Sequence, residues 1–371
     1  TPLAHWRRVR RAALLRFRDS RLLEERPFPP PPEEPRADPS AVATQVRAAL
    51  DSYGRSQHSI HASLLELSGG FDSTLAAAGP SRQGMRGVSV VFPYYEFRFE
   101  APVQRATAEF LGIPRVELDG LGLFPYAPGD APARFDEPTV FVTGIRHAEA
   151  VARLGGTFGA KRLYVGHGGD QCFATDLCAP EPLAANALTR GPFAVRAWRE
   201  VRRAIDETHR SPWNDRRLGT FVFDARQVVW GKETFGSSMR TPFSDLQVFR
   251  SALTWSRACA SRGVRPHKGI LAQAARDLLP DAVLERKGKV AYDGVWTRAY
   301  RRHGESIAAT FEDVRDVFSH LGVSTDWLQR RVLELGAWQD RSDREVLALF
   351  GIAVWLTAWG LLRAGDLHWA D

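Results

Sequence analysis

Residues 62–76 read Ala-Ser-Leu-Leu-Glu-Leu-Ser-Gly-Gly-Phe-Asp-Ser-Thr-Leu-Ala, and they give the strongest indication of the fold. Ala62 to Leu67 is a mainly apolar run of the length expected for a buried strand. A turn of small residues follows, and a helical pattern begins at Ser73. A buried strand that leads directly into a helix is typical of a parallel α/β sheet.

Strand and helix patterns continue to alternate downstream. Further strands are predicted at Gly87 to Phe92, Arg115 to Leu118 and Arg162 to Val165, and helices at Glu100 to Leu111 and Val140 to Leu154. Strands that alternate with helices pair in parallel, so we predict an open, doubly wound parallel sheet, whose ligands bind at the carboxyl ends of its strands. Strand signals fade past Cys178 apart from Thr220 to Phe223, and Leu183 to Asp371 is predicted to be mostly helical.

The first 39 residues have a different character. Apolar residues recur at near-helical spacing between arginines in residues 3–25, which predicts a basic amphipathic helix. Pro27 to Pro39 contains seven prolines and predicts an extended linker. Ser40 is the expected N-cap of a helix over Ala41 to Tyr53.

We therefore predict three parts of the chain. Residues 1–39 are the helix and linker, and because the sequence begins at Thr1 we interpret them as the remnant of a longer N-terminal region. Residues 40–180 are expected to form the α/β core. Residues 181–371 are expected to form a helical part that completes the same site.

The turn from Ser68 to Thr74 has the residue types of a phosphate-binding loop. Two glycines let the backbone approach a ligand, and Ser68, Ser73 and Thr74 place hydroxyls beside the amides of a helix N-terminus, which favours anions. No lysine follows the glycines, which distinguishes this turn from the Walker A loop. Asp72 would repel a bare phosphate, so its presence suggests a magnesium ion that the phosphates also bind.

Ser68-Gly69-Gly70-Phe71-Asp72-Ser73 resembles the pyrophosphate loop of the PP-loop ATP pyrophosphatases, which cleave ATP between its α and β phosphates. A second turn, Tyr164 to Gln171, resembles the G-x-G-S/G-D-E/Q turn of asparagine synthetases, and Asp136-Glu137-Pro138 precedes it as in that family. The resemblance implies an adenine nucleotide alpha hydrolase-like α/β core that binds ATP and Mg²⁺. It assigns ATP binding to Ser68, Gly69, Gly70, Asp72, Ser73, Gly166, Gly168 and Asp170, with Asp72 and Asp170 as the metal ligands.

Downstream motifs extend the resemblance over residues 40–310. Met239 to Asp245 is similar to the family's R-x-P-F-x-D, and the K-x-L-R, L-P and R-x-K elements are matched by Lys268 to Leu271, Leu279-Pro280 and Arg286 to Lys289. In the second turn the chain departs from the family. It has His167 where asparagine synthetases have a glutamate and β-lactam synthetases have a tyrosine.

Adenylation of a carboxylate followed by attack of an amine requires a fixed cation and a base. The R-x-x-K pattern followed by Tyr292 most resembles lasso peptide cyclases, which assigns the cation to Lys289, with Lys287 as the alternative. His167 is the candidate for orienting the amine or accepting its proton, and equally for a turn residue set by backbone geometry.

The function implied is ATP-dependent amide-bond formation. The chain has no cysteine before Cys172, so the N-terminal nucleophile of a glutaminase domain is missing and the substrate is expected to bring its own amine. We predict macrolactam closure of a lasso precursor (core) peptide, with a leader peptidase and a leader-binding protein as partners. The alternatives are an asparagine synthetase-like ligase acting on a small acid, an RNA-modifying ATP pyrophosphatase, and a nucleotide-binding homologue without activity.

The net charge, the cysteine content and the apolar stretches of the chain help to choose among these possible functions. The net charge of +7 suits an anionic ligand, and we assign it to ATP and a peptide carboxylate rather than to nucleic acid. Three cysteines without C-x-x-C spacing argue against a zinc or disulfide framework and are compatible with a cytoplasmic protein. The longest apolar stretch, Val346 to Leu362, is interrupted by Gly351, Thr357 and Gly360, so no membrane span is predicted.

Overall fold

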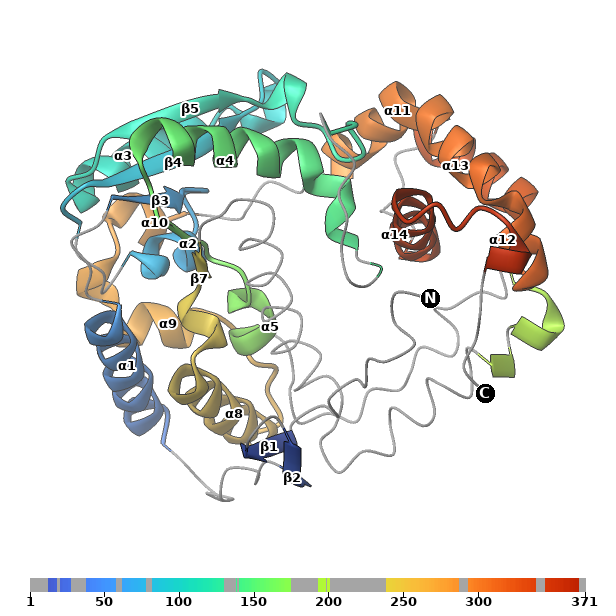
Figure 1. The fold of residues 1–371 in the computed structure, drawn as a ribbon. Helices are drawn as coiled ribbons and strands as arrows, with labels where there is room; N and C mark the ends of the chain where they lie inside the picture. The colour runs from blue at the N-terminus through green and yellow to red at the C-terminus, as the bar shows by residue number, and fades with distance from the viewer. Residues whose placement is uncertain are drawn as a thin grey trace.

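A computed structural model of the chain describes residues 13–18, 21–27, 38–57, 62–77, 82–129, 138, 140–174, 193–197, 199–200, 238–286, 293–337 and 344–366. The described residues form two groups of elements (Figure 1). One group contains a parallel sheet with its covering helices, and the other contains four helices from the last third of the chain.

Within the part of the chain that the structure describes, the sheet has five strands, all parallel. They are β3 (Ser63–Glu66), β4 (Met85–Val91), β5 (Arg115–Asp119), β6 (Arg162–Tyr164) and β7 (Ser238–Arg240). Their order across the sheet is β5-β4-β3-β6-β7. Leu64 in the central strand β3 pairs with Arg86 on one side and Leu163 on the other. The prediction of an open parallel sheet is confirmed, and the strands predicted at 62–67, 87–92, 115–118 and 162–165 correspond to β3, β4, β5 and β6.

Helices cover both faces of the sheet. On one face, α3 (Glu100–Leu111) packs Ala108 and Leu111 against Leu65 of β3. On the other face, α4 (Ile145–Phe158) packs Val151 against Leu64. Neighbouring residues of β3 thus face opposite helices, as the two-residue period of a strand requires, and the sheet is buried on both sides.

The strand order places the expected ligand-binding position at the centre of the sheet. The chain leaves β3 in one direction towards β4 and β5, then returns through α4 to β6 on the other side of β3. The carboxyl ends of β3 and β6 therefore flank the point where the strand order reverses, which is where open α/β sheets bind their ligands. Both predicted turns, after Leu67 and after Val165, lie there.

The strand β7 comes from a segment predicted to be helical. Met239 pairs with Leu163, and Arg240 pairs with Tyr164. Three residues are too few to show a strand period, and only the pairing with β6 identifies this segment. The predicted strand at Thr220 to Phe223 lies outside the described residues.

A layer of helices from two distant parts of the chain packs beside the sheet. It contains α1 (Pro39–Ser56), α8 (Leu246–Ala260) and α9 (Gly269–Ala274), which share one apolar core with α5 (Gly169–Phe173). The helix predicted after the linker is confirmed, but its N-cap is Asp38, whose carboxylate accepts a hydrogen bond from the Ser40 amide at 3.0 Å. The prediction of Ser40 as N-cap is wrong because Pro39 occupies the first helical position.

The predicted N-terminal helix is also wrong where the structure describes it. Ala13–Arg18 (β1) and Arg21–Pro27 (β2) form an antiparallel hairpin. In the register of the two strands, Arg16 is the partner of Glu24, and the register shifts between Arg16 and Phe17. The conformation therefore depends on pairing between two strands, which the apolar spacing along one segment does not show. Residues 28–37, which contain most of the predicted linker, lie outside the described residues.

The second group is helical, as predicted for the described residues that form it. Its helices are α11 (Asp293–Asp313), α12 (Arg315–His320), α13 (Thr325–Ala337) and α14 (Arg344–Ala358). They share a core with Phe92, Phe124 and Tyr126, which follow β4 and β5. The Tyr126 and Tyr300 hydroxyls lie 2.8 Å apart and join the two groups.

The remaining described helices are short. They are α2 (Phe71–Ala76), α10 (Asp281–Leu284), and 3-10 turns at Tyr95–Phe97, Gly120–Gly122, Val140–Gly144, Pro242–Ser244, Arg276–Leu278 and Ala364–Asp366. Within the described ranges, no helix combines the length and the apolar character that crossing a bilayer requires.

The stability of the fold should be most sensitive to substitutions in the central strand β3. We expect Leu65→Ala to destabilise the protein by about 2–5 kcal/mol, because Leu65 is fully buried under α3 and its removal leaves a cavity. Thermal unfolding followed by circular dichroism measures the loss. Leu333→Ala on α13 is the matched control, because Leu333 is 65% exposed. Equal effects of the two substitutions would contradict the assigned core.

Candidate active site

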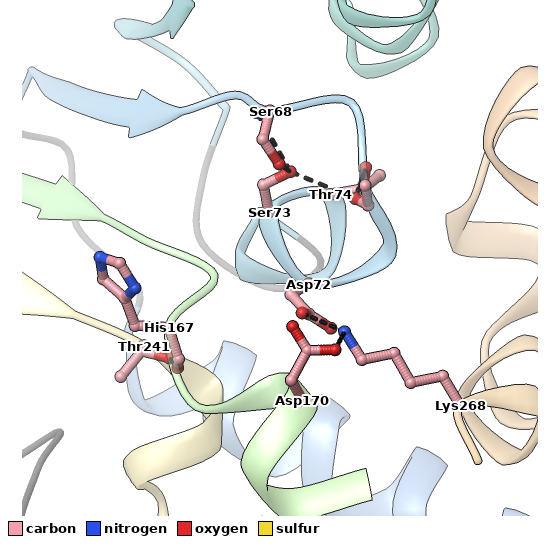
Figure 2. Close-up of polar contacts among 9 residues, drawn as sticks. Ser68, Asp72, Ser73, Thr74, His167, Asp170, Thr241 and Lys268 are labelled. Carbon is pink, nitrogen blue, oxygen red and sulfur yellow. Dashed lines mark hydrogen bonds and ion pairs between the residues drawn. The ribbon is translucent and has the colours of Figure 1, made fainter. Parts of the chain in front are cut away.

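The loop after β3 is held by its own hydroxyls. The Ser68 amide donates a hydrogen bond to Ser73 Oγ at 3.3 Å, and Ser73 Oγ donates one to the Gly70 carbonyl at 3.2 Å. Thr74 Oγ1 also donates to the Gly70 carbonyl, at 2.8 Å (Figure 2). Gly69 has a φ of +70°, a conformation that other residues adopt at a cost. The sequence therefore fixes the shape of this loop before any ligand binds.

The turn after β6 lies directly on this loop. Gly168 has a φ of +98° and precedes α5. A Cβ atom at Gly166 would lie 2.6 Å from the backbone carbonyl carbon of Asp72, and one at Gly169 would overlap the Asp72 carboxylate. Glycine is therefore required at positions 166 and 169 because the backbones of the two turns are in contact.

This contact brings the two predicted metal ligands together around a lysine. Lys268, which precedes α9, directs its ammonium group between the carboxylates of Asp72 and Asp170 (Figure 2). Lys268 Nζ forms an ion pair with Asp72 Oδ2 and another with Asp170 Oδ1 at 2.7 Å. The side chains of Asp72 and Lys268 are 15% and 21% exposed, so solvent screens this pair only partly.

The donor set fits a hydrated magnesium ion shared with phosphates. Two carboxylates converge here, and Mg²⁺ in nucleotide sites is usually bound by one or two carboxylates plus phosphate oxygens and water. Among the described residues, no three His, Cys, Asp or Glu side chains gather as a complete protein metal site would. Asp72 and Asp170 would therefore hold the ion together with the nucleotide.

A second cation anchors the far side of the loop. Arg286 Nη1 donates a hydrogen bond to the Gly69 carbonyl at 3.0 Å, and its Nη2 forms an ion pair with Glu100 at the start of α3. Arg286 is the first residue of the predicted Arg286 to Lys289 element. That element therefore begins in contact with the loop, although Lys287 and Lys289 themselves lie outside the described residues, as do Asp136 and Glu137.

The predicted His167 does not face the carboxylate pair. Its side chain points away from Asp72, Asp170 and Lys268 (Figure 2). Its Nε2 lies 3.9 Å from Glu66 Oε2, and Thr241 Oγ1 donates a hydrogen bond to its backbone carbonyl at 2.7 Å. Ser68, Gly69, Gly70, Asp72, Ser73, Gly166, Gly168 and Asp170 all lie at the carboxyl ends of β3 and β6.

Three residues of the site were missed as functional residues by the sequence analysis. Lys268 and Arg286 were noted only as motif positions, and nothing in their spacing shows that they contact a loop about 200 residues away. Glu66 was included in the predicted strand Ala62 to Leu67 and was given no role. A charged residue at the end of a buried strand, two positions before a ligand-binding turn, is the signal that could have identified it.

The close contact of the two turns can be tested at Gly166. We expect Gly166→Ala to lower the thermal unfolding midpoint and to weaken ATP binding, measured by calorimetry, because the new methyl group displaces Asp72. Gly156→Ala is the matched control. Gly156 is exposed on α4 with open space around it, so alanine should stabilise that helix by up to ~1 kcal/mol and leave nucleotide binding unchanged. Normal ATP affinity in Gly166→Ala would contradict the arrangement of the turns.

Residues 233–357 match the family model of asparagine synthase. A search of curated proteins finds no match to the chain. The matched segment includes β7, Lys268 and Arg286, whereas both turns lie before it. Lys268 and Arg286 nonetheless contact these turns, so the matched and unmatched parts build one site. The match supports the asparagine synthetase-like family, and with it ATP binding and ATP-dependent carbon–nitrogen ligation as the general activity.

Proposed function

We propose that this protein adenylates a carboxylate with ATP and closes an amide bond, and that its substrate is a lasso precursor peptide cyclised by its own N-terminal amine. One observation carries the general chemistry. The segment that matches asparagine synthase supplies Lys268 and Arg286 to the two turns at the carboxyl ends of β3 and β6.

In the first step, the adenylation of the carboxylate, the described residues have different roles. The loop from Ser68 to Ser73 presents hydroxyls and the first amides of α2, which have no partner within the helix, to the pyrophosphate part of ATP. Lys268 supplies positive charge beside Asp72 and Asp170. Magnesium held by these two carboxylates would neutralise phosphate charge as the bond between the α and β phosphates breaks.

The second step needs a cation at the acyl carbon. We assign it to Lys289, with Lys287 as the alternative, because this element starts at Arg286 on the loop. Nucleophilic attack on the acyl adenylate creates a tetrahedral oxyanion, which a fixed ammonium group stabilises. Tyr292 and the R-x-x-K pattern support the cyclase assignment over a ligase for a small acid.

The peptide substrate can be tested directly. The protein is incubated with ATP, Mg²⁺, a precursor peptide, its leader peptidase and the leader-binding protein. We expect AMP, pyrophosphate and a peptide product that is lighter by one water, detected by mass spectrometry. Formation of ADP, or no change in peptide mass, would contradict the proposal. If a free amino acid rather than a peptide supports ATP–pyrophosphate exchange, the alternative of a small-acid ligase is correct.

The described cysteines do not favour the RNA-modifying alternative. Cys172 and Cys259 are both buried, at 0% and 1% exposure, so neither is accessible for sulfur transfer.

The carboxylate pair should be essential. We expect Asp72→Asn and Asp170→Asn each to reduce AMP release about 100-fold or more, because each removes a metal ligand and part of the charge balance around Lys268. AMP release is measured by chromatography at saturating ATP. Asp326→Asn is the control, because Asp326 is exposed on α13 and pairs only with Arg315 among the described contacts. Retained activity in both site variants would exclude the two-carboxylate site.

A further inference from the structure

A second polar cluster lies at the end of the central strand, separate from the carboxylate pair. The Glu66 carboxylate, at the end of β3, lies between two histidines. His147 Nε2 on α4 is 3.3 Å from Glu66 Oε1, and His167 Nε2 is 3.9 Å from Glu66 Oε2. We call these three residues the Glu66 cluster.

The Glu66 cluster lies on the α4 face of the sheet. Glu66 is two positions after Leu64, so both side chains point to the same face, and Leu64 packs in the core with Val151 of α4. His147 precedes Val151 by four residues and therefore lies on the same side of α4. The turn after β6 directs Asp170 towards Lys268, and the His167 side chain points away from that pair (Figure 2). His167 instead lies beside Glu66.

A ligand can reach this cluster. The side chains of Glu66, His147 and His167 are 26%, 36% and 47% exposed. This exposure is intermediate, since the residues are held by neighbouring elements but are not sealed in the core. The Thr241 hydrogen bond to the His167 carbonyl fixes the backbone from which this imidazole projects.

The chemistry of the cluster selects a primary amine. A carboxylate accepts hydrogen bonds only, and each neutral imidazole offers one acceptor nitrogen, whereas a primary ammonium group carries three donors and a positive charge. Charge-assisted hydrogen bonds of this kind are the stronger ones in proteins. We propose that Glu66, His147 and His167 bind the amine nucleophile of the reaction, and that His167 accepts its proton.

This inference rests on the proposed function and adds the amine subsite to it. The amine nitrogen forms a bond with the acyl carbon of the adenylate. The bond between that carbon and the AMP oxygen breaks, and AMP leaves with the electron pair. The bound ammonium group loses two protons in all. The first passes to His167 before the attack and frees the lone pair of the nitrogen, and the second leaves the nitrogen after the C–N bond has formed and passes to solvent. The Glu66 carboxylate stabilises the imidazolium of His167 that results. Glu66 and His147 are thus binding and positioning residues, whereas His167 is the catalytic one.

The first test separates the two half-reactions in the complete enzyme. ATP–pyrophosphate exchange reports adenylation without the amine, and peptide cyclisation reports both steps. We expect Glu66→Gln to keep exchange near the wild-type rate and to slow cyclisation by roughly tenfold to a hundredfold, the range for a lost charge-assisted hydrogen bond. Glu66→Asp should recover part of the loss. Glu117→Gln, an exposed carboxylate in the middle of β5, is the matched control. Normal cyclisation in Glu66→Gln would overturn the inference and leave the proposed function intact.

The second test needs no substrate and decides the inference even if the adenylation chemistry is wrong. The protein labelled with ¹³C-histidine is titrated with methylammonium chloride, and with tetramethylammonium chloride, which has no N–H donor, at equal ionic strength. We expect saturable shifts of the His147 and His167 Cε1–H signals with methylammonium alone, and at least a tenfold weaker response in Glu66→Gln. Absence of saturable shifts in the wild type, or equal shifts with both salts, would overturn the amine site.

Discussion

The contact of two turns around one lysine is the constraint on which the rest of the site depends. The close approach of Gly166 to the backbone of Asp72 forces the turns after β3 and β6 together, and each turn carries a carboxylate. Two like charges about 4 Å apart repel by ~4 kcal/mol at the effective dielectric of a protein surface. The ammonium group of Lys268 offsets this repulsion. The positive charge of Lys268 is therefore needed to keep the two carboxylates together. It lies beside the carboxylates that are proposed to hold the magnesium ion.

The turn after β6 also divides the site into two regions with different chemistry. Asp170 belongs to the region that carries the positive charge of Lys268 and the hydroxyls of the first loop. His167, three residues earlier, belongs to the Glu66 cluster on the α4 face. The proposed reaction needs an anion site and an amine site on either side of one acyl carbon. In this proposal, the turn after β6 supplies Asp170 to the anion site and His167 to the amine site.

The local sequence pattern was sufficient to predict most strands of the sheet and the turns that follow them. It was insufficient where the conformation of a segment depends on its pairing with another strand. The strand and turn from Ala62 to Ser73 are recognisable because period, glycines and hydroxyls agree within twelve residues. The three residues of β7 acquire their conformation only from β6, and the hairpin at residues 13–27 forms through cross-strand pairs that a single-strand pattern does not contain. The ion pair between Lys268 and Asp72 spans 196 positions, so no spacing rule relates them.

The ion pair between Arg286 and Glu100 is a positioning element rather than a source of stability. Their side chains are only 15% and 9% exposed, and at such burial the loss of hydration roughly cancels the attraction between the charges. Substituting one partner would leave the other charge buried and uncompensated. What the pair provides is geometry, since Arg286 also holds the Gly69 carbonyl and begins the element that contains Lys287 and Lys289. The asparagine synthase-like segment is thereby fixed to the PP-loop at the residue from which the proposed catalytic lysines extend.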